Sequence, residues 1–126
     1  MMANHAKILL IDDEPILRRL LTRALRPHTI ITAEDGAQAL EILENEPPFD
    51  LVICDLSMPG ISGDQVFRHA IAQDPSLQKR FVIITGGAVT PTQHRFLKDM
   101  QPRLLEKPFT PAQLRALIPS PAGVQG

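Results

Sequence analysis

Five polar residues stand at or just after the ends of short apolar runs, and together their types suit phosphoryl transfer. They are Asp12, Asp13, Asp55, Thr85 and Lys107. A carboxylate can attack phosphorus, further carboxylates can hold a divalent metal, and a hydroxyl and an ammonium can neutralise phosphoryl oxygens. Taken singly, each has an ordinary structural explanation; Asp55, for example, could simply cap a strand and begin a turn. The functional interpretation therefore depends on whether the fold brings the five together.

Apolar runs of strand length recur along the chain, at residues 7–11, 29–33, 51–55, 81–85 and 103–106. The first, third and fourth are the most apolar, as expected for central strands of a parallel sheet covered on both faces. The second is β-branched and mixed, and the fifth is short, so both suit outer strands.

Segments with helical periodicity alternate with these strands. They are expected over about 15–26, 36–45, 63–74, 91–100 and 111–118. Three of the helix starts carry a capping-box pattern, in which an Asp or Thr cap is followed three residues later by Gln. These pairs are Asp35 with Gln38, Thr90 with Gln93, and Thr110 with Gln113.

This alternation predicts an α/β fold of the flavodoxin-like (βα)5 type. Right-handed crossovers place helices on both faces of a five-stranded parallel sheet, and the hydrophobicity of the strands favours the order 2-1-3-4-5. Every strand then delivers its carboxyl end to one edge, where ligands bind between strands one and three. The five polar residues should meet at that edge.

Three carboxylates at one edge repel one another unless a cation compensates them. Lys107 is one candidate cation, and a divalent metal bound by Asp12, Asp13 and Asp55 is the other. Oxygen ligands without nearby cysteine or histidine favour Mg²⁺ over zinc. Because Mg²⁺ keeps positions for water and phosphoryl oxygens, the residues predict phosphoryl transfer to a carboxylate nucleophile.

Composition restricts the other possibilities. The 126 residues carry a net charge of −1 and include neither Trp nor Tyr, which argues against nucleic-acid binding. No apolar run is long enough to span a membrane, and no signal-peptide pattern begins the chain. The single cysteine, Cys54, leaves no disulfide framework and suits the cytoplasm. We expect a loose N-terminus at 1–6, one domain at 7–118 and a disordered tail at 119–126.

Four motifs, in this order and spacing, resemble those of the response-regulator receiver domain, of which chemotaxis regulators are examples. They are Ile11-Asp12-Asp13-Glu14-Pro15, Asp55-Leu56-Ser57-Met58-Pro59-Gly60 with Gly63, Ile84-Thr85-Gly86, and Glu106-Lys107-Pro108-Phe109. The resemblance implies that a histidine kinase or a histidine phosphotransfer domain donates the phosphoryl group. It also implies no enzyme activity beyond phosphorylation and dephosphorylation of the domain itself.

The resemblance further implies how the metal is held. Asp55 would be the phosphoacceptor and would bind Mg²⁺ together with Asp13 and the backbone carbonyl of Ser57, whereas Asp12 would act largely through water. Ser57 and Gly87 stand where such domains tune the lifetime of the phosphoryl group. Both are small, so that group should be open to water and to a partner.

Lys107 and Thr85 would contact phosphoryl oxygens, and a cis peptide bond before Pro108 would aim the lysine inward. One position departs from the family pattern. Receivers usually carry an aromatic residue or histidine three residues before the lysine, and here Leu104 stands there. The usual relay from the threonine to an aromatic side chain is therefore in doubt. Ile16, off the apolar stripe of the first helix, is a candidate contact for a kinase.

Alternative functions remain open at this point. The domain could bind a partner constitutively without being phosphorylated, which Leu104 favours and the intact site opposes. It could be a hydrolase with an aspartyl nucleophile, of the haloacid dehalogenase type, although the first strand ends differently and no cap insertion is present. The chain could be a single-domain regulator or the C-terminal receiver of a hybrid histidine kinase. A weak dimer through the fourth helix, fifth strand and fifth helix is compatible with either.

Overall fold

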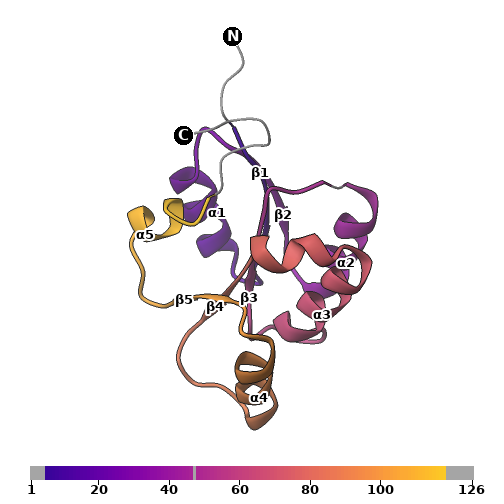
Figure 1. Cartoon of the computed structure of the whole chain (residues 1–126). Helices are drawn as coiled ribbons and strands as arrows, with labels where there is room; N and C mark the ends of the chain where they lie inside the picture. Colours follow the sequence, from indigo (N-terminus) through magenta and orange to yellow (C-terminus); the bar gives the residue numbers. More distant parts are fainter. Residues whose placement is uncertain (1–4, 47, 119–126) are drawn as a thin grey trace.

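The computed structural model describes residues 5–46 and 48–118, and its centre is one five-stranded parallel sheet (Figure 1). The strand order is β2-β1-β3-β4-β5, so the predicted fold class and order are confirmed. The strands are β1 (Lys7–Ile11), β2 (Thr29–Ala33), β3 (Leu51–Asp55), β4 (Phe81–Thr85) and β5 (Arg103–Glu106).

Helices cover both faces of the sheet. They are α1 (Pro15–Ala24), α2 (Gly36–Asn45), α3 (Gly63–Gln73), α4 (Pro91–Met100) and α5 (Pro111–Arg115). In Figure 1, α1 and α5 lie on one face and α2 and α3 on the other. Phe96 of α4 packs in the same half of the core as α2 and α3, so α4 lies on that face too. In the described part of the chain, no helix is both long enough and apolar enough to cross a membrane.

The core has two halves because successive side chains of a strand point to opposite faces. On β1, Leu9 and Ile11 join the half under α2 and α3. Ile8 and Leu10 join the half under α1 and α5. All five residues of β3 and of β4 are buried, as the sequence predicted for central strands. The Asp55 carboxylate is therefore attached to the end of a fully buried strand.

Three local features differ from the predictions. A 3₁₀-helix, η1 (Pro75–Arg80), follows α3; it begins where the Asp74 side chain accepts the Ser76 N–H. The α-helix α5 ends at Arg115, short of the predicted residue 118, and the N–H groups of Leu117 and Ile118 bond carbonyls three residues back. In the box at α2, Asp35 does accept the Gln38 N–H, but the glutamine oxygen bonds the N–H of the preceding residue, Glu34.

The expected chain ends lie mostly outside the described residues. This applies to the tail at 119–126 and to 1–4. Ala6, expected to belong to the loose N-terminus, is buried, and its N–H donates to Nδ1 of His28 at 2.9 Å.

Candidate functional site

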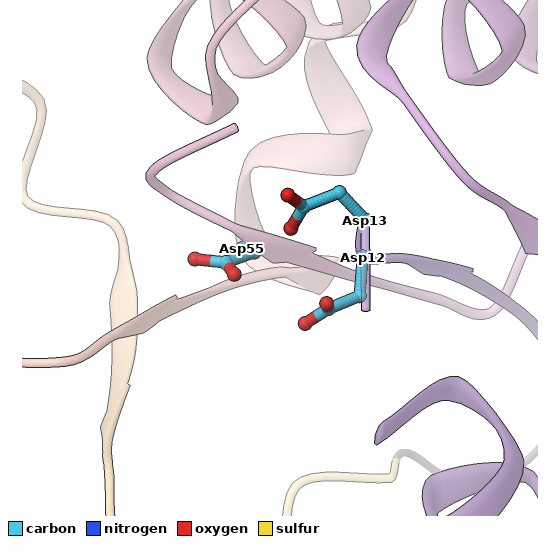
Figure 2. A group of neighbouring side chains, drawn as sticks. All are labelled: Asp12, Asp13 and Asp55. Carbon is cyan, nitrogen blue, oxygen red and sulfur yellow. The ribbon is translucent and has the colours of Figure 1, made fainter. Parts of the chain in front are cut away.

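The candidate site lies at the carboxyl ends of β1 and β3. Asp12 directly follows β1 and Asp55 ends β3, and the parallel pairing of Ile11 with Cys54 sets them side by side. One carboxylate oxygen from each of Asp12, Asp13 and Asp55 lies within 4.8 Å of the other two. Figure 2 shows the three side chains gathered there. The structure therefore brings together the carboxylates that the sequence singled out.

Backbone contacts fix Asp12 in place. Its N–H donates to the Ala33 carbonyl at 3.1 Å, and its carbonyl accepts a guanidinium N–H of Arg18 at 2.6 Å. The Oδ1 oxygen accepts the Glu14 N–H at 2.8 Å. The Arg18 side chain thus ties α1 to the backbone at the end of β1.

The other oxygen of Asp12, Oδ2, is buried and has no hydrogen-bond partner among the described residues. Burial raises the pKa of Asp12 from 3.8 to about 6; the Glu14 N–H opposes this rise and the charge of Asp55 adds to it. A buried carboxylate oxygen without a partner is costly unless something compensates it. A cation is the simplest compensation.

Asp55 is also buried, at 7% exposed. Its Oδ1 accepts the Ser57 N–H at 3.1 Å, and burial raises its pKa although that N–H and Lys107 lower it. The first residue of α3, Gly63, packs against this turn; a Cβ there would lie 2.4 Å from the Asp55 carbonyl oxygen. Only glycine permits so close an approach, which explains why the motif needs it.

Lys107 brings a positive charge to the same place from the loop after β5. Its Nζ lies 3.7 Å from Asp55 Oδ2 and 3.6 Å from Glu14 Oε1. Its backbone N–H donates to the Thr85 carbonyl at 2.9 Å, which ties the loop to the end of β4. The peptide bond before Pro108 is cis, as predicted.

Thr85 is buried at the end of β4, and its Oγ1 accepts the Gly87 N–H at 3.1 Å. Thr85 does not line the pocket that opens over Asp55, whereas Gly86 and Ala88, which follow it in the chain, do. The threonine hydroxyl therefore lies at the margin of the site in this structure, bonded to its own turn. Leu104, on the adjoining strand, is 43% exposed.

A pocket of about 360 Å³ opens over these groups. Its lining is Asp13, Glu14, Asp55, Ser57, Gly86, Ala88 and Lys107. The donor set fits a hard divalent cation, because three carboxylates converge with one buried oxygen unpartnered and no sulfur or nitrogen ligand in the group. The pocket leaves room beside that group for a phosphoryl-sized ligand.

Sequence reasoning missed two residues of this region. Glu14 shares Lys107 with Asp55; its place directly after the two aspartates was the available signal. Gln93 of α4 was predicted only as a capping residue, but its Nε2 also donates to Ser57 Oγ at 3.3 Å. No local pattern signals that second contact, because the two residues are 36 positions apart.

The fold and the acidic pocket define a class: a five-stranded parallel α/β domain with a pocket typical of a phosphoacceptor site. The sequence matches the family described as "Response regulator receiver domain" over residues 8–119. The chain therefore belongs to the response regulator receiver domain family.

Several relatives show the range of proteins that contain such a domain. The chain is 40% identical over 125 residues to cyclic di-GMP phosphodiesterase RocR of Pseudomonas aeruginosa, covering 91% of this chain and 31% of RocR. It is 33% identical to the probable chemotaxis protein CheY of Rhizobium etli, covering 92% of each. It is 30% identical to sensor kinase CckA of Brucella abortus, covering 93% of this chain and 12% of CckA.

The chain thus spans about a third or less of some relatives and nearly all of another. A segment similar to the chain also lies within the sensor histidine kinase TmoS of Ectopseudomonas mendocina, covering 92% of this chain and 12% of TmoS. Among solved structures, the response regulator receiver protein of Sinorhizobium medicae is similar, with a TM-score of 0.76 and 32% identity. That similarity covers 90% of this chain and 91% of the other.

Proposed function

We propose that this domain accepts a phosphoryl group on Asp55 in a Mg²⁺-dependent reaction. The observation that carries the proposal is the convergence of groups on this one residue. The Asp55 carboxylate lies in the group of three aspartates and is 3.7 Å from the Lys107 ammonium. A merely structural aspartate at a strand end needs neither neighbour.

In the proposed reaction, an Asp55 carboxylate oxygen attacks the phosphorus of a phosphohistidine. The new O–P bond forms as the P–N bond breaks, and the imidazole nitrogen leaves with the electron pair and is protonated. Lys107 neutralises a phosphoryl oxygen, and Thr85 donates its hydroxyl to another after turning from Gly87. Water attacking the same phosphorus returns phosphate and the free carboxylate.

Asp13, Asp55 and the carbonyl of Ser57 would hold Mg²⁺, with Asp12 acting through water. The bound ion supplies positive charge next to the phosphoryl oxygens. The unpartnered Oδ2 of Asp12 supports this assignment, since a bridging water gives that oxygen a donor. The same observation disfavours the alternative of a domain that binds a partner constitutively and is not phosphorylated. Such a domain needs no cation, and a buried carboxylate oxygen without a partner would only lower its stability.

Acetyl phosphate with Mg²⁺ tests the proposal by intact mass. We expect one added phosphoryl group, none with EDTA, and none in Asp55→Asn. Asp50→Asn is the control, since Asp50 lies at the other end of β3 from the site. A phosphoryl group that persists in Asp55→Asn, or a wild type that stays unmodified with Mg²⁺, would refute it.

The phosphodonor we propose is a histidine kinase or a histidine phosphotransfer domain in the cytoplasm. A groove of about 680 Å³ runs between α1 and the loop before α5, and Glu14 and Lys107 line both it and the acidic pocket. Ile16 and Leu20, 71% and 57% exposed, line it too. An apolar helical surface on the donor would cover both and place its histidine near Asp55.

Ile16→Ser tests this contact. We expect phosphorylation by acetyl phosphate to stay normal, because Ile16 is exposed and contacts no reacting group, while transfer from the donor protein slows at least tenfold. His69→Ser, at an exposed position of α3 on the opposite face, is the control. Equal transfer rates in wild type and Ile16→Ser would show that the donor does not dock on this surface.

A further inference from the structure

One hydrogen bond links the candidate phosphorylation site to α4. Ser57 donates its backbone N–H to Asp55 Oδ1 at 3.1 Å. Its side-chain Oγ accepts Nε2 of Gln93 at 3.3 Å. A single residue therefore contacts both the Asp55 carboxylate and the first turn of α4.

Both ends of the Gln93 amide are engaged. Oε1 accepts the Thr90 N–H at 2.9 Å, while Thr90 Oγ1 accepts the Gln93 N–H at 3.1 Å. The side chain therefore belongs to the cap of α4 and to the loop after β3 at once. Gln93 is only 9% exposed, which is uncommon for glutamine and reflects its position between two elements.

The capping boxes at the starts of α3 and α5 provide an internal comparison; the one at α3, formed by Ser62 and Gln65, adds to those predicted from the sequence. Gln65 at α3 and Gln113 at α5 also accept the N–H of their cap residue, at 3.0 and 2.7 Å. Both glutamines are exposed, and among the described residues neither donates to another element. The start of α5 even repeats the Thr-Pro-x-Gln sequence of α4. The sequence of the box is therefore not what buries Gln93; its place against Ser57 is.

A change at the Asp55 carboxylate must change the acceptor of the Ser57 N–H. Phosphorylation converts that carboxylate to an acyl phosphate, which moves the negative charge from the carboxyl oxygens to the phosphoryl oxygens, and hydrogen bonds to charged acceptors are stronger than those to neutral ones. Ser57 is then free to shift, and its Oγ carries Gln93 and the α4 cap with it. Leu104 cannot hydrogen-bond the Thr85 hydroxyl, whereas the Ser57 side chain makes a direct hydrogen bond to a residue of α4.

We propose that Gln93 is a positioning residue that couples the first turn of α4 to the state of Asp55 through Ser57. This inference rests on the proposed function, because it needs Asp55 to be the modified residue. Its new content is the hydrogen bond between Gln93 and Ser57 as the contact that carries the change to α4.

Hydrogen exchange with Mg²⁺ and beryllofluoride, a phosphoryl analogue, tests the coupling. The His94 N–H bonds the Thr90 carbonyl at 2.8 Å and reports on the first turn of α4. In the wild type, we expect beryllofluoride to change its protection factor about fivefold, the effect of one ordinary hydrogen bond. In Ser57→Ala, which keeps the backbone N–H to Asp55, and in Gln93→Met, we expect this response to be lost.

Gln113→Met is the matched control, because it removes the equivalent capping bond of α5 without touching Ser57; its His94 response should equal that of the wild type. The two site variants should also be non-additive when combined, as expected for partners in one bond. The backbone amide at position 57, which both serine and alanine supply, monitors occupancy of the site in every sample. If it responds while His94 responds equally in Gln93→Met, the coupling is wrong and the phosphoacceptor assignment stands. If it does not respond in the wild type, both are wrong.

Discussion

The carboxylates at the two ends of the sheet have opposite environments: the one at the amino end is hydrogen-bonded to a neighbouring strand, and those at the carboxyl end lie against one another. At the amino end, Asp50 accepts the Lys7 N–H through Oδ2 at 2.8 Å, and its own N–H donates to the Lys7 carbonyl at 2.8 Å. At the carboxyl end, Asp12, Asp13 and Asp55 face one another, and Asp12 Oδ2 has no partner among the described residues. Asp50 thus joins β1 to the start of β3, whereas the three carboxylates at the other end repel one another.

This contrast separates a structural carboxylate from a functional one. A hydrogen bond to a charged acceptor contributes stability, so Asp50 favours the folded state. Burial and mutual repulsion make ionised Asp12 unfavourable, so it must reduce the stability of the metal-free domain. The metal-free domain is therefore less stable at the end of the sheet where a bound cation would compensate the charge.

The largest expected effect is on metal affinity. Asp13→Asn removes a charged oxygen from the group of three, and we expect Mg²⁺ affinity to fall at least about 100-fold, the upper range for even indirect metal partners. Isothermal titration calorimetry measures this Mg²⁺ affinity. Asp50→Asn should bind Mg²⁺ as the wild type does; a loss there would erase the contrast between the two ends.

The next effect is on the free energy of unfolding, measured with urea in EDTA at pH 7.5. Asp12→Asn keeps an oxygen for the Glu14 N–H and removes the buried charge, so we expect a gain of about 1–3 kcal/mol. Asp50→Ala leaves the Lys7 N–H without its acceptor, and we expect a loss of about 1–3 kcal/mol. Changes of the same sign in both variants would contradict the comparison.

The smallest effect is a pH dependence in the metal-free protein. The folded-state pKa of Asp12, about 6, lies above its unfolded value of 3.8, so the folded state binds more protons between them. Stability from this group should fall as the pH rises from about 4 to about 6, by at most about 1.4 kcal/mol per pH unit. The difference in the free energy of unfolding between wild type and Asp12→Asn isolates this contribution. A difference that does not change with pH over this range would mean that the pKa of Asp12 is not raised in the folded state.

The sequence predicted the sheet well because each strand is a short apolar run with clear boundaries. Parallel topology then requires the strand ends to meet, so the sequence alone places Asp12, Asp13, Asp55 and Lys107 together. The missed features depend on other information. The 3₁₀-helix after α3 has no apolar periodicity, and the Ser57–Gln93 contact joins two segments whose relative placement no local pattern determines.

The most direct test of the account is the location of the phosphoryl group. The protein is phosphorylated with acetyl phosphate and Mg²⁺, reduced with borohydride to convert an aspartyl phosphate to homoserine, digested and mapped by mass. We predict homoserine at Asp55 and at no other aspartate. Homoserine at Asp12 or Asp13, or at none of the three despite an added phosphoryl mass, would contradict it.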